Sequence, residues 1–260
     1  DGITEPEYRV GFDRNLWLWG QYDASCSYLL AADVARGDGA DHSVFHVIKL
    51  ETMEVIGEYQ GKPNLEQFAS ILDSTGREYG NCMLVVENNS LGISILEKLQ
   101  DREYPNLYFS VKSTHEYITE EQAQGINNSV PGFTTSSKTR PLIIAKMEEF
   151  IRNQLITIYS SRIIGEFKTF IWNNNKAQAM RSYNDDLVMA FAIACWVRDT
   201  ALTVNQRDME YNKAMMSSMI ISSKQMDTTI PGMAGHKINN SGKLREQRKN
   251  YEDFIWLLKG

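Results

Sequence analysis

The sequence predicts an α/β protein built on one mixed β-sheet with helices on both of its faces. Residues 28–34 and 83–87 form two nearly continuous apolar runs, which are typical of strands buried on both faces. Helical spacing of apolar residues recurs between the short strands, an alternation that adds parallel strands through crossover connections. A group of three strands with short connections comes before this alternation and predicts an antiparallel part of the same sheet.

The elements follow in this order. Residues 28–34, 44–50 and 53–59 are apolar or alternating and are joined by short turns, which predicts a three-strand antiparallel meander. A helix is expected over 64–79, ended by Gly80, followed by the strand at 83–87, a helix over 92–99 and a strand over 107–111. Residues 113–140 are polar and predict a long loop, and loops of that length are usually functional or mobile. A helix over 141–153, a strand over 155–158 and helices over 161–170 and 185–198 complete the domain.

Composition and cysteine spacing set limits on the class of protein. The 260 residues carry a net charge of −6, with 42% hydrophobic and 23% charged residues, as in ordinary globular domains. We expect an N-terminal segment over 1–27 that packs on the domain, a sheet domain over 28–202 and a flexible C-terminal tail over 203–260. No apolar run approaches the roughly 20 residues of a membrane span. Three separated cysteines without a paired spacing argue against a zinc site and a disulfide framework and favour a reducing compartment.

Acidic side chains stand where strands end and where a helix begins. Asp33 lies at the end of the first apolar run, Glu87 ends the second, Asp185 and Asp186 open the last helix, and Asp41 lies in the first turn. Each one alone fits a solvated strand end or a helix cap. Acids at the ends of adjacent strands and at a helix start can converge on one point at the edge of the sheet, and oxygen ligands of this kind suit Mg²⁺ or Mn²⁺. Two such ions support phosphoryl transfer, so the combination predicts a metal-dependent nuclease.

Basic side chains gather around the long loop and just before the acidic pair. In an acidic chain, a polyanionic partner must be held by a local basic stripe or through metal ions. Each residue alone fits a solvated surface, but as a group they are predicted to contact phosphates and to position a duplex without reading its sequence. The predicted DNA contacts are Lys138, Arg140, Lys146, Arg181 and Arg36.

Four segments resemble the nuclease domain of tailed-bacteriophage large terminases, most closely those of T-even-like phages. They are AADVARGDGADHSVFHVI, LVVENNSLG, KTRPLIIAKMEEFI and SYNDDLVMAFAIA, and the resemblance covers residues 28–197. It implies a ribonuclease-H-like fold with a site for two Mg²⁺ or Mn²⁺ ions, in which Asp33 and Glu87 are ligands. The third ligand comes from Asp185 or Asp186; we favour Asp186, since the first residue of the pair more plausibly caps the helix. Asp41 falls where the family often has a further acid.

The resemblance also implies a function and partners. We expect a largely sequence-nonspecific DNA endonuclease that cuts concatemeric viral DNA during packaging, in the host cytoplasm and transiently on the prohead. Its partners would be double-stranded DNA, a terminase ATPase domain, the portal and the small terminase subunit, with no membrane. A phosphate-binding loop motif is missing from the sequence, so ATP hydrolysis is not expected of these residues. The alternatives are a Holliday-junction resolvase or transposase-like nuclease of the same fold, and a non-catalytic docking module for the packaging motor.

Overall fold

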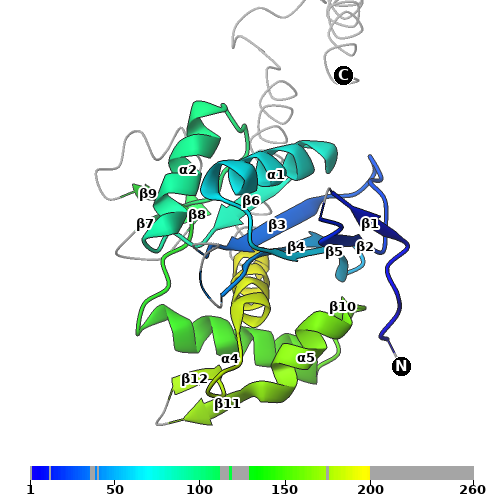
Figure 1. Ribbon diagram of the computed structural model, residues 1–260, viewed down its shortest axis with the longest axis vertical. Coiled ribbons are helices and arrows are strands. Elements are labelled where there is room, and N and C mark those ends of the chain that lie inside the picture. Colours follow the sequence, from blue (N-terminus) through cyan, green and yellow to red (C-terminus); the bar gives the residue numbers. More distant parts are fainter. Residues whose placement is uncertain are drawn as a thin grey trace, which may run out of the picture. The chain divides into compact units, whose positions relative to one another are not determined.

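A seven-stranded sheet lies at the centre of the computed structural model, which describes residues 2–11, 13–35, 39, 41–111, 117–118, 129–173 and 176–199 (Figure 1). Six strands follow one another across the sheet in the order β1-β2-β5-β4-β3-β6, and β10 pairs with β5. Their bounds are β1 (Tyr8–Val10), β2 (Leu16–Leu18), β3 (Tyr28–Asp33), β4 (Ser43–Lys49), β5 (Glu54–Gly61), β6 (Met83–Val86) and β10 (Thr157–Ile158).

The strand directions confirm the predicted mixed sheet. β3, β4 and β5 form the antiparallel meander, while β6 is parallel to β3 and β10 is parallel to β5. In the register of the β3–β6 pair, Ala32 lies opposite Val86. The residues that follow these two positions, Asp33 and Glu87, therefore lie next to each other at the same end of the sheet.

Helices cover both faces of the sheet, because β3 and its neighbours are apolar on both sides. Leu30 and Ala32 belong to the core cluster under α1 (Leu65–Glu78) and α2 (Leu91–Asp101). Leu29 and Ala31 belong to the opposite cluster, formed with α4 (Thr139–Arg152), α5 (Ser161–Thr169) and the helix over 186–199. Figure 1 shows the two layers on either side of the strands. Because successive side chains of β3 point to opposite faces of the sheet, the strand contributes to both hydrophobic clusters.

Several elements go beyond the sequence prediction. The segment over 1–27 supplies the sheet strands β1 and β2. β7 (Phe109–Val111) pairs with β8 (Tyr117–Ile118) and β9 (Ser129–Pro131) in a small separate sheet, so part of the expected loop is strand. A hairpin of β11 (Phe170–Asn173) and β12 (Lys176–Ala179) follows α5.

Some predictions fall on the remaining residues. Arg36 and the tail over 203–260 lie outside the described residues. Among the helices that the structure describes, none is long and apolar enough to cross a membrane.

Candidate metal centre

Asp33 and Glu87 lie side by side at one end of the central sheet. The N–H of Glu87 donates to the carbonyl oxygen of Ala32 at 2.9 Å, which continues the β3–β6 pairing to the residue before Asp33. The pKa of Asp33 is raised well above its usual range, first by burial, then by the negative charge of Glu87, a hydrogen bond with that carboxyl group, and the charge of Asp186. Three carboxyl groups from three separate elements therefore share one electrostatic environment.

Two glycines allow the chain to wrap closely around the end of β6. A Cβ at Gly92 would overlap the carbonyl oxygen of Glu87, and a Cβ at Gly132 would overlap that of Val86. Gly132 also has a φ of +77°, a conformation that favours glycine. Glu87 is 9% exposed, and its Oε1 accepts a hydrogen bond from Asn89 Nδ2 at 2.7 Å. Backbone packing and Asn89 together set the direction of this carboxylate.

Asp186 begins the helix over 186–199 and faces the loop before β4. Its Oδ2 accepts hydrogen bonds from the N–H of His42 at 2.7 Å and from Asn184 Nδ2 at 3.3 Å. The pKa of Asp186 is raised to about 6 as the net result of burial, which raises it most, the His42 N–H, which lowers it, and the negative charges of Asp41 and Asp185, which raise it. The charge of Asp41 thus acts on the same carboxylate.

Asp185 has a different environment from Asp186. Its Oδ2 accepts a hydrogen bond from Arg140 Nη2 at 2.7 Å in an ion pair. Its carbonyl oxygen accepts the N–H of Met189, so Asp185 is the N-cap residue that precedes the first helical residue, Asp186. Arg140 also donates to the carbonyl oxygen of Ala177 from Nε at 3.2 Å and from Nη2 at 3.1 Å. The structure therefore neutralises Asp185 with an arginine and leaves Asp186 among acids.

The predicted DNA contacts differ in how much of their charge is available. Lys138, at the start of α4, and Arg181, between β12 and the last helix, are exposed. Lys146 instead pairs with Glu149 at 2.8 Å and with Asp199 at 3.0 Å, and Arg140 is held by Asp185. We therefore expect phosphate contacts from the exposed Lys138 and Arg181 more than from Lys146 and Arg140, whose charges are paired with acids.

Glu166 on α5 lies beside the centre and was not among the acids predicted from the sequence. Its Oε2 accepts the N–H of Val188 at 3.2 Å, in the first turn of the helix that begins at Asp186. Burial raises the pKa of Glu166 to about 8, with a further contribution from the charge of Asp186. A helical projection would have indicated it, since Glu166 lies three residues after the buried Ile163 on the same face.

The donor chemistry of the centre fits a hard divalent cation. Within the described ranges, no three acidic, histidine or cysteine side chains already stand at metal-ligand distances. Asp33 and Glu87 are instead hydrogen bonded to each other, and the pKa values of Asp33 and Asp186 are raised. Crowded carboxylates take up protons when no cation balances them. Asp33, Glu87 and Asp186 offer only oxygen ligands, which is the set that Mg²⁺ and Mn²⁺ prefer.

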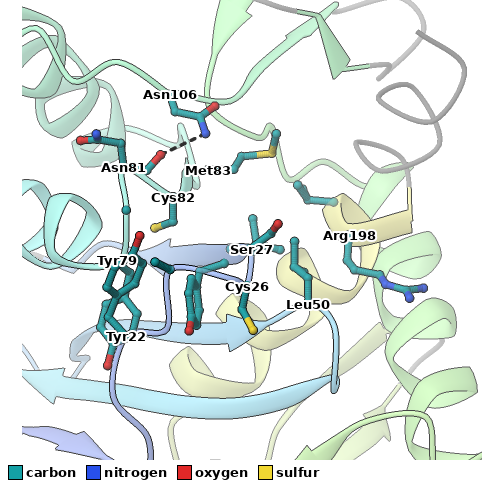
Figure 2. A pocket seen from close by; sticks show the side chains of 15 residues that line it. Tyr22, Cys26, Ser27, Leu50, Tyr79, Asn81, Cys82, Met83, Asn106 and Arg198 are labelled. Carbon is teal, nitrogen blue, oxygen red and sulfur yellow. Dashed lines mark hydrogen bonds between the residues drawn. The ribbon is translucent and has the colours of Figure 1, made fainter. Parts of the chain in front are cut away.

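A separate cavity lies at the other end of the central strands. It has a volume of about 400 Å³, and its lining includes Tyr28 and Met83, the first residues of β3 and β6. Figure 2 shows Tyr22, Tyr79 and Cys26 around it. None of the acids of the centre lines this cavity, so the sheet separates it from the chemistry proposed below.

Comparison with known proteins relates this fold to a class of viral nucleases. No protein-family model matches the chain. The chain is similar to the large terminase nuclease from thermophilic phage G20c with bound magnesium, at 20% identity and a TM-score of 0.54. It is also similar to the cobalt-bound form of that nuclease, at 21% identity and a TM-score of 0.55. Each match covers 74% of this chain and 91% of that chain. The large terminase nuclease domain of a Thermus phage is 21% identical with a TM-score of 0.54, covering 74% of this chain and 88% of that one. The described domain thus has the ribonuclease-H-like fold of phage large terminase nucleases.

Proposed function

We propose that this chain is a Mg²⁺- or Mn²⁺-dependent DNA endonuclease domain of the large terminase type. The observation that carries the proposal is the convergence of Asp33, Glu87 and Asp186 at one end of the sheet, where the negative charges of both Glu87 and Asp186 act on the Asp33 carboxyl group. The similar fold of terminase nucleases with bound magnesium and cobalt supports the same site type.

The residues of the centre divide into those that hold ions and those that position them. Asp33, Glu87 and Asp186 would hold two ions, which when bound generate a nucleophile from water at neutral pH and stabilise the leaving oxygen of a phosphodiester. The His42 N–H fixes the Asp186 carboxylate, and Asn89 fixes that of Glu87. Because the pKa of Asp33 is raised in the metal-free chain, ion binding would release a proton from this site.

The biological setting is proposed from the sequence resemblance to T-even-like phages. The domain would cut concatemeric viral DNA with little sequence preference, in the host cytoplasm and transiently on the prohead. The terminase ATPase domain, the portal and the small terminase subunit would be its protein partners. The exposed Lys138 and Arg181 offer charges for the phosphates of double-stranded DNA.

Nicking of supercoiled plasmid tests the proposal. With Mn²⁺ or Mg²⁺ the chain is expected to convert plasmid to nicked and linear forms, and Asp33→Asn is expected to abolish this. Asp101→Asn, an exposed acid at the end of α2, is the matched control and should cut like the original chain. If neither the chain nor the control cuts with any divalent ion, the nuclease proposal is wrong.

Cleavage of branched DNA and thermal stability with Mn²⁺ separate the two alternatives from the proposal. A resolvase or transposase-like enzyme would cut four-way junctions or branched DNA in strong preference to plain duplex. A docking module would show no cutting and no saturable effect of Mn²⁺ on its thermal stability. The proposal instead predicts both cutting of plain duplex and stabilisation by Mn²⁺ that Asp33→Asn weakens.

A further inference from the structure

We propose that the cavity between α4 and the β11–β12 hairpin binds an unstacked nucleotide of the DNA, with Trp172 as the surface on which its base stacks. This inference rests on the proposed nuclease function and extends it to the form of the substrate. The cavity has a volume of about 530 Å³, within the range of small-molecule sites. Ser136, Ser137, Arg140, Trp172 and Lys176 are among the residues that line it.

Trp172 presents an exposed aromatic side chain beside the cavity. Trp172 is 61% exposed on β11, and Tyr183, which follows the hairpin, is 59% exposed. An indole buries most of its surface when it serves a core, so one left open beside a cavity offers its flat face to a ligand. Every nucleobase has a matching flat face, and base–aromatic stacking is the common means of holding unpaired nucleotides.

The two chain segments that line the cavity are rich in basic residues. Residues 131–147 contribute three basic residues and residues 167–184 contribute three more, and neither segment contains an acid. Arg140 and Lys146 are balanced by acids outside these segments, which leaves an excess of positive charge at the exposed Lys138, Lys168, Lys176 and Arg181 in a chain whose net charge is −6. A surface for an apolar protein partner would not need such an excess, whereas aromatic residues among basic ones are typical of nucleic-acid binding.

Hydrogen bonds of Arg140 connect the hairpin beside the cavity to the acidic centre. Trp172 lies opposite Ala177 in the hairpin register, and opposed residues share one face of an antiparallel pair. The carbonyl oxygen of Ala177 is bound by Arg140, which also binds Asp185, the neighbour of Asp186. One arginine therefore connects the stacking surface to the predicted metal ligands. Because bases inside a duplex stack on each other, only an unpaired or flipped base can reach Trp172.

Binding measured by fluorescence anisotropy in EDTA, where no cutting occurs, tests the inference. The probes are a labelled 15-nucleotide single strand and a labelled hairpin duplex of the same sequence. Trp172→Ala is expected to weaken single-strand binding about tenfold, as expected for one lost stacked base, and duplex binding less than twofold. Trp172→Phe, which keeps an aromatic face, should bind within about twofold of the original chain. Tyr8→Ala is the matched control, since Tyr8 is 46% exposed on the edge strand β1.

The outcomes separate this inference from the proposed function. Unchanged single-strand binding by Trp172→Ala, or an equal loss for both probes, would overturn the stacking role. If the same preparation still nicks plasmid with Mn²⁺, only this inference is wrong. A loss specific to single strands in a chain that never cuts DNA would keep the nucleotide site and contradict the nuclease proposal. Thermal melts of each variant establish that it is folded, and Trp172→Phe provides a second test if the alanine variant does not fold.

Discussion

Replacing Asp186 by asparagine should stabilise the metal-free chain at neutral pH. The side chain of Asp186 is 14% exposed and lies near the charges of Asp41 and Asp185. Asparagine has nearly the same shape and keeps an oxygen that can accept the hydrogen bonds from the His42 N–H and from Asn184. The substitution therefore removes a charge from a crowded site without removing its hydrogen bonds.

The expected size follows from the raised pKa of Asp186. The folded chain holds this proton more tightly than the unfolded chain, with a pKa of about 6 against 3.8. The stabilisation from the protonated carboxyl is complete below about pH 4 and is lost as the pH rises through 6. At 1.36 kcal/mol for each tenfold change in proton affinity, the loss amounts to about 3 kcal/mol at pH 8. We expect Asp186→Asn to recover about 1–3 kcal/mol of it, or several degrees in melting temperature.

Urea unfolding in EDTA at pH 4 and pH 8 measures this effect. The variant should be more stable than the original chain at pH 8, and its advantage should shrink towards zero at pH 4. Asp101→Asn, on the exposed end of α2, should change the free energy of unfolding by less than about 0.5 kcal/mol at both values. An advantage that is missing at pH 8, or that is equal at both pH values, would refute the reasoning about this carboxylate.

Three further predictions concern the backbone, the DNA surface and the tail. Gly92→Ala should lower the free energy of unfolding in urea by about 2 kcal/mol or more, because its Cβ overlaps the Glu87 carbonyl oxygen. Gly165→Ala on α5 has open space around its Cβ and should raise the free energy of unfolding by up to about 1 kcal/mol, and equal effects of the two substitutions would contradict this. Lys138→Ala should weaken duplex binding equally across sequences and lower its salt slope by about one, and an unchanged slope would assign Lys138 to the solvated surface. A chain ending after Leu202 should keep its fold and metal-dependent cutting, and a melting temperature several degrees lower would show that the tail belongs to the core.

The central sheet was predictable because its strongest signals are local. The apolar runs at β3 and β6 are long enough to be buried on both faces and each ends at or beside an acid. Parallel pairing of these two strands then brings Asp33 and Glu87 together. One short stretch of sequence around each strand therefore contains both the element and its contribution to the site.

The hairpin and the edge strands were not predictable for the opposite reason. Most side chains of β11 are exposed, and all three of β1 are exposed, so neither has the alternation of apolar and polar residues that marks a half-buried strand. Their backbone pairing, and not burial, makes them strands. The hairpin that carries Trp172 was accordingly absent from the sequence prediction.

Contacts between residues far apart in the sequence could not be predicted either. Arg140 was predicted as a phosphate contact, but its ion-pair partner Asp185 is 45 residues away. Glu166 approaches Val188 from another helix, 22 residues earlier in the chain. Such contacts depend on how α4, α5 and the last helix pack, which the local pattern of each helix does not determine.

Anomalous diffraction from crystals soaked in Mn²⁺ locates bound ions themselves and therefore tests the proposed metal centre without relying on activity. We expect anomalous peaks within about 2.0–2.4 Å of carboxylate oxygens of Asp33, Glu87 and Asp186, at the end of β3 and β6. Crystals of Asp33→Asn should show no such peaks. A peak held by other residues, or full occupancy in the Asp33→Asn crystals, would contradict it.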